Sequence, residues 1–146
     1  TGEVPEESYA TPIGEASVVR PGENFTIVAY SRMVYEALDA AEELAKLGVD
    51  TEVIDLRSLQ PLDTETMIES VKKTHRAMVV HEAVRFGGMG GEIAAQIQEL
   101  AFDYLDAPVA RIGAPFSPVP FSPVLEEHYI PNANRIVAEA RALLDV

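Results

Sequence analysis

The chain has 146 residues, of which 47% are hydrophobic and 24% are charged, so it is long enough for one domain with a buried core. It contains no cysteine, which excludes disulfides and thiolate chemistry, and no apolar run approaches the roughly 20 residues of a membrane span. Its 24 acidic and 11 basic residues give a net charge of −13, which makes nucleic acid and anionic membranes poor partners and would attract a basic protein.

Strand and helix patterns alternate along the chain. Strands are predicted over residues 13–20, 25–30, 51–56, 76–81 and 108–112, and helices over 33–45, 64–73, 93–105 and 135–144. The continuous apolar run 25–30 suits a strand that is buried on both faces. Asp63 and Asn134 are candidate N-caps, and Gly48 is the expected end of the first helix. Three of the helix boundaries therefore have a local signal.

A tandem repeat, Pro115–Val119 and Pro120–Val124, follows the last predicted strand. Two copies of five residues do not make a repeat protein, and their prolines lack backbone donors. We expect this segment to be an extended connector.

The order of the elements predicts the fold class. Strands that alternate with helices form right-handed crossovers and a mainly parallel sheet. We expect a three-layer α/β domain with helices on both faces of a mixed sheet of about five strands. Four strands would be parallel, and residues 13–20 would form an antiparallel edge strand.

The carboxyl ends of parallel strands are where such sheets bind ligands, and the sequence puts Ser31, Arg57 and His81 there. The glycines after His81 match neither a dinucleotide fingerprint nor a phosphate loop, and Glu92 would repel a phosphate. We therefore interpret them as a turn with close helix–strand packing. His81 could be a ligand or a general base, but a buried histidine is usually hydrogen-bonded in place.

Several blocks of sequence, read together, carry a resemblance to a known family. They are residues 11–44, Val53–Ala83, Gly90–Ala94, Leu105–Pro108, Pro120–Pro123 and Tyr129–Pro131. Together these blocks resemble the third, C-terminal domain of transketolase-like thiamine diphosphate enzymes. More narrowly, they resemble the β subunit of the decarboxylating component of 2-oxo acid dehydrogenase complexes of pyruvate, branched-chain or acetoin type.

The resemblance implies an architecture and an activity. Residues 1–12 would be a linker from a missing N-terminal pyrimidine domain, and residues 13–146 would be the transketolase C-terminal-like domain. The whole enzyme, in a bacterial cytoplasm or a mitochondrial matrix, would oxidatively decarboxylate a 2-oxo acid and acylate lipoyl groups. It would use thiamine diphosphate and Mg²⁺, which this domain would not bind, so the isolated domain would be inactive.

The resemblance also implies partners. They are an α subunit, a second β subunit and the basic subunit-binding domain of the dihydrolipoyl acyltransferase. Asp106 matches an acidic family position that pairs with that basic domain, and Asp103 and the terminal carboxylate of Val146 are weaker candidates. The alternative hypothesis is a stand-alone regulatory α/β domain that holds a small anion with Ser31, Arg57 and His81.

Overall fold

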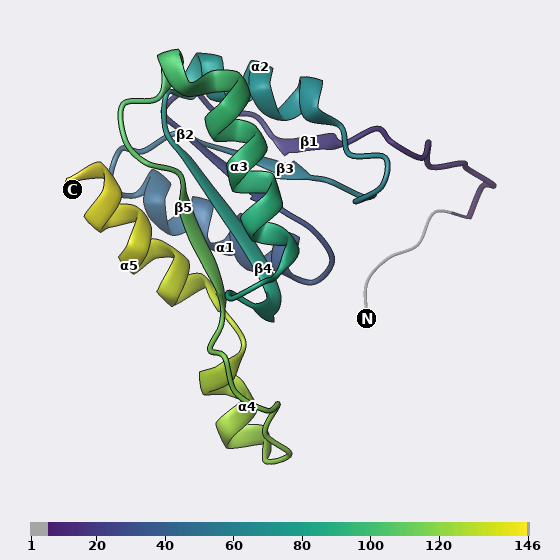
Figure 1. Cartoon of the computed structure of the whole chain (residues 1–146), viewed down its shortest axis with the longest axis vertical. Helices are drawn as coiled ribbons and strands as arrows, with labels where there is room; N and C mark the ends of the chain where they lie inside the picture. Colours follow the sequence, from purple (N-terminus) through teal and green to yellow (C-terminus); the bar gives the residue numbers. More distant parts are fainter. Residues whose placement is uncertain (1–5, 146) are drawn as a thin grey trace.

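The computed structural model describes residues 6–145 as one α/β domain (Figure 1). Its strands are β1 (Ser17–Arg20), β2 (Phe25–Ala29), β3 (Thr51–Asp55), β4 (Ala77–Val84) and β5 (Ala110–Ala114). Its helices are α1 (Met33–Ala45), α2 (Thr64–Thr74), α3 (Met89–Ala101), the 3-10 turn η1 (Phe102–Tyr104), α4 (Pro123–Tyr129) and α5 (Ala133–Leu144).

The five strands form one mixed sheet in the order β1-β3-β2-β4-β5. β2 pairs in parallel with both β3 and β4, and β4 pairs in parallel with β5. β1 pairs antiparallel with β3 at the edge of the sheet. The predicted sheet of four parallel strands and one antiparallel edge strand is therefore confirmed.

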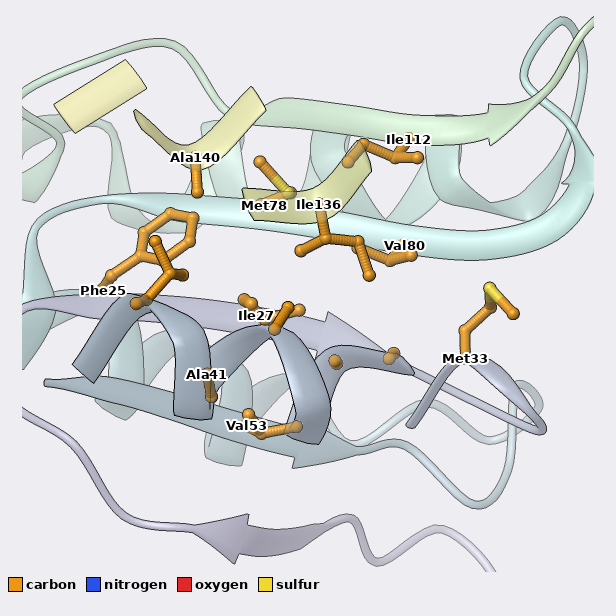
Figure 2. Packing of buried hydrophobic residues seen from close by; sticks show 14 of the residues in the cluster. Phe25, Ile27, Met33, Ala41, Val53, Met78, Val80, Ile112, Ile136 and Ala140 are labelled. Atoms are coloured by element: carbon orange, nitrogen blue, oxygen red, sulfur yellow. The ribbon is translucent and has the colours of Figure 1, made fainter. Parts of the chain in front are cut away.

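Helices cover both faces of the sheet, and each face has its own apolar core. On one face α1 and α5 cover the strands, and Ile136 and Ala140 belong to the same buried cluster as Phe25 and Ile27 (Figure 2). On the other face α2 and α3 contribute residues such as Met67 and Ile93. Every residue of β2 is buried, as a central strand between two helical layers must be.

Asp63 begins α2 as predicted and also holds the chain that leads into β1. Its carboxylate accepts hydrogen bonds from the backbone N–H groups of Thr66 (3.0 Å) and Ala16 (2.9 Å). Burial acts to raise the pKa of the Asp63 carboxyl, but these hydrogen bonds hold that pKa below its ordinary value. One side chain therefore caps a helix and fixes the approach to the edge strand.

Every strand differs from its prediction at one end or both, and the difference exceeds one residue in β1, β4 and β5. β1 begins only at Ser17, because the preceding residues do not pair with β3. β4 continues past His81 to Val84, which pairs with Ala114 across an irregular register. β5 begins at Ala110 rather than Pro108, because its ladder with β4 starts there.

The helix boundaries also needed correction. The predicted cap Asn134 is wrong, because the side chain of Asn132 accepts the hydrogen bond from the Arg135 N–H (3.0 Å) and α5 begins at Ala133. α3 begins earlier than predicted, at Met89, and is followed by η1. The predicted extended connector is not extended at its end, because the short helix α4 begins within it at Pro123. Within residues 6–145 no helix is long and apolar enough to cross a bilayer.

Candidate functional site

The predicted site residues lie at opposite ends of the parallel strands. Ser31 and Arg57 follow β2 and β3, and His81 lies in the second half of β4, toward the carboxyl edge of the sheet. Asp103 and Asp106 come just before β5, at the amino edge. The chain therefore has two separate candidate surfaces rather than one.

At the carboxyl edge, Ser31 and Arg57 are both exposed and both have left-handed backbones, with φ of 57° and 56°. The Ser31 hydroxyl donates to Oε2 of Glu82 (3.3 Å). The backbone N–H of Arg57 donates to Oδ1 of Asp55 (3.0 Å). These contacts shape the ends of the strands, but they bring no two of the three predicted residues together.

His81 is closed off from solvent. Its side chain is 0% exposed and stacks against Tyr30 with ring centroids 6.2 Å apart. Neither ring nitrogen has a hydrogen-bond partner among residues 6–145, so the expectation that His81 is hydrogen-bonded in place is wrong. Burial, and then the charge of Arg111, lower the pKa of the imidazole, which favours the neutral ring.

The glycines after His81 allow the close helix–strand packing that the sequence predicted. A Cβ at Gly88 would lie 2.7 Å from Cε1 of His81, and a Cβ at Gly90 would overlap Cδ2 and Nε2 of the same ring. The first turn of α3 can therefore lie directly on the imidazole. As long as this turn stays in place, no ligand in solution reaches His81.

At the amino edge, Asp106 is exposed on a firmly held backbone. Its N–H donates to the carbonyl of His75 (2.9 Å), and Nδ1 of His75 lies 2.8 Å from the carbonyl oxygen of Tyr104. His75 itself ends α2 with a φ of 62°. These bonds join the end of α2 to η1, where Asp103 is also exposed. Two carboxylates are therefore presented from a braced turn.

A shallow hollow surrounds Asp106. It is lined in part by Glu23, Asn24, His75, Arg76 and Leu144, so its charge is mixed rather than uniformly acidic. Leu144 brings the end of α5 to this edge, whereas Val146 lies outside the described residues. Sequence reasoning missed Glu23 and Arg76, although both precede parallel strands whose starts share this edge.

Comparison with known proteins identifies the domain. Residues 14–136 match the family described as "Transketolase, C-terminal domain". The chain belongs to this family. This transketolase C-terminal domain is 49% identical over 140 residues to the acetoin:2,6-dichlorophenolindophenol oxidoreductase subunit beta of Cupriavidus necator. It is 46% identical over 143 residues to the pyruvate dehydrogenase E1 component subunit beta of Staphylococcus epidermidis.

These alignments cover 96% and 98% of the chain but only 41% and 44% of the two relatives. The chain thus spans less than half the length of the curated relatives it matches. A solved structure described as "Split gene transketolase, inactive beta4 tetramer" matches with 28% sequence identity and a TM-score of 0.79. The match covers 99% of this chain and 46% of the chain of that structure. The family resemblance and the fold are therefore confirmed.

Proposed function

We propose that this transketolase C-terminal domain is the assembly and docking part of the β subunit of a thiamine diphosphate-dependent dehydrogenase. The supporting observation is its 49% and 46% identity, over nearly the whole chain, to β subunits of an acetoin oxidoreductase and a pyruvate dehydrogenase. The domain would join an α subunit and a second β subunit. Residues 1–12, of which 1–5 lie outside the described part, would lead in from a pyrimidine domain.

The cofactor would be held by other parts of the enzyme. Among residues 6–145 no group of three His, Asp or Glu side chains is arranged to hold a metal ion. The full sequence contains no Gly-Asp-Gly, and His81 is buried. The residues present do not fit Mg²⁺ or a diphosphate, so we assign this domain no chemical step and expect it to be inactive alone.

The amino edge would receive the basic subunit-binding domain of the acyltransferase. Asp106 is exposed on a backbone fixed by His75, and Asp103 is exposed nearby on η1. The net charge of −13 would favour a basic partner at long range.

Calorimetry tests this docking function. The acyltransferase subunit-binding domain would be titrated into the natural gene product that contains this chain, at low and high salt. We expect Asp106→Ala to weaken binding by about 2–5 kcal/mol, because an ion pair buried at the interface would lose one partner. Asp39→Ala, an exposed carboxylate on α1, is the matched control. Equal affinities of the Asp106→Ala variant and the wild type would remove Asp106 from the site.

The substrate is a separate question. The two relatives named above are both bacterial, which supports a bacterial rather than a mitochondrial setting, and one is named for acetoin and the other for pyruvate. Turnover of pyruvate, acetoin and branched-chain 2-oxo acids by the natural α and β subunits, measured separately for each compound, would identify the substrate. A stand-alone anion-binding domain is not favoured, because Ser31, Arg57 and the buried His81 do not jointly face solvent.

A further inference from the structure

An arm formed by residues 115–131 projects from the carboxyl end of β5, away from the other helices (Figure 1). The Tyr129 hydroxyl donates to the carbonyl of Ser117 (3.0 Å) and ties the arm to itself. Despite this order, the arm exposes large apolar side chains, with Phe116 at 76% and Phe121 fully exposed. Val119, Val124 and Leu125 are exposed as well. Soluble proteins seldom leave a contiguous apolar patch uncovered unless it binds something.

Three arginines lie at the base of this arm. Arg85, Arg111 and Arg135 line one hollow together with Phe86 and Phe116, whose rings meet edge to face with centroids 5.1 Å apart. We call this the arginine hollow. Within residues 6–145 none of the three guanidinium groups has a carboxylate at ion-pair distance. In a chain with 24 acidic residues, three neighbouring cations without a partner are unexpected.

The acidic residues of the arm do not neutralise the hollow. Glu126 and Glu127 of α4 line a different hollow, which they share with Arg32 at the start of α1. The arginine hollow thus keeps its positive charge beside exposed aromatic rings. Arginine and aromatic side chains are the residues that contribute most to protein–protein binding.

The charge of the hollow discriminates among the partners of the proposed function. A second copy meeting this face across a two-fold axis would bring both arginine hollows into one interface, because such a contact uses the same patch on both subunits. The basic acyltransferase domain would be repelled. We infer that the arm and the arginine hollow form the docking face for a different subunit, which presents carboxylates beside apolar side chains. This inference rests on the proposed function, whose α subunit is the remaining partner.

The test uses the natural gene product that contains this chain together with its α subunit. Mass photometry would give the dissociation constant of the α–β contact for wild type, for Arg85→Glu/Arg135→Glu and for Phe121→Asp. We expect a rise of at least tenfold in both variants, and a weaker salt dependence in the charge-reversed one. Lys46→Glu, at the C-cap of α1, and Tyr35→Asp, on α1, change exposed residues that do not line the arginine hollow; they are the matched controls and should leave the constant unchanged. Unchanged melting temperatures would show that the variants fold.

The outcomes separate this inference from the proposed function. If wild-type β and both variants bind α with the same dissociation constant, the inferred docking face is wrong and the proposed function still stands. Variants that lose β–β pairing while keeping α overturn the choice of occupant in favour of a second copy. Failure of wild-type β to bind α at all overturns the proposed function and the inference with it.

Discussion

The imidazole of His81 lies so close to Gly90 that a Cβ at that glycine would overlap the ring. The two residues belong to β4 and to the first turn of α3, and a Cβ at Gly88 would lie 2.7 Å from Cε1 of the same imidazole. Close packing of the helix on the strand therefore depends on the missing side chain of Gly90. It also encloses an imidazole that has no hydrogen-bond partner among the described residues.

Gly90→Ala should destabilise the domain by about 1–3 kcal/mol, because the new methyl group forces the ring or the helix to move. Urea unfolding would measure the change. Gly91→Ala is the control, since its Cβ would meet only Nη1 of Arg111 at 3.1 Å, the end of a flexible side chain. The double variant His81→Ala/Gly90→Ala should lose less free energy of unfolding than the sum of the losses in the two single variants. Strict additivity would contradict the overlap.

His81 should make stability sensitive to mild acid. Its pKa is lowered in the folded state, so the unfolded chain binds a proton more readily. Above the ordinary histidine pKa of about 6.5, His81 is neutral in both states and does not affect the free energy of unfolding. As the pH falls below that value, protonation of His81 in the unfolded chain should progressively lower the free energy of unfolding. His81→Leu should flatten the dependence between pH 5 and 7.5, as followed by urea midpoints. His128→Ala, exposed on α4, should not, and an unflattened curve for His81→Leu would refute the assignment.

Asp63→Ala should cost about 1–2 kcal/mol, because α2 loses its N-cap and the Ala16 N–H loses its acceptor. The lowered pKa of Asp63 means that its charge-dependent stabilisation is present above its ordinary pKa of about 3.9 and is lost as the pH falls through the folded value. Asp63→Asn keeps a capping oxygen without the charge and should lie between wild type and alanine in thermal melts. An alanine variant as stable as wild type would rule out this dual role.

Local signals predicted the parts of the fold that depend on neighbouring residues. The unbroken apolar run of β2 indicated a central strand, and Asp63 was identified as a cap because it precedes an amphipathic run. α4 was missed because the prolines of the repeat 115–124 argued for an extended chain. However, Pro123 occupies the first helical position, where a missing N–H costs nothing. Two asparagines flank the start of α5, and which of them caps it is decided by backbone geometry.

The candidate surfaces were harder to predict because they combine distant residues. Arg85, Arg111 and Arg135 come from the end of β4, from β5 and from α5, and they meet only because β5 pairs with β4 and α5 follows the arm. His81 was placed correctly on a buried strand, although that strand continues past it to Val84. Its lack of partners depends on Tyr30 and the first turn of α3, which no local pattern encodes.

The last helix has a consequence for biosynthesis. α5 supplies Ile136, Ala140 and Leu144 to the same core that α1 covers. A ribosome must therefore release nearly the whole domain before that face of the sheet can close. Until then, the nascent chain presents Val80 and Ile112 on partly covered strands, a state prone to aggregation that chaperones commonly protect.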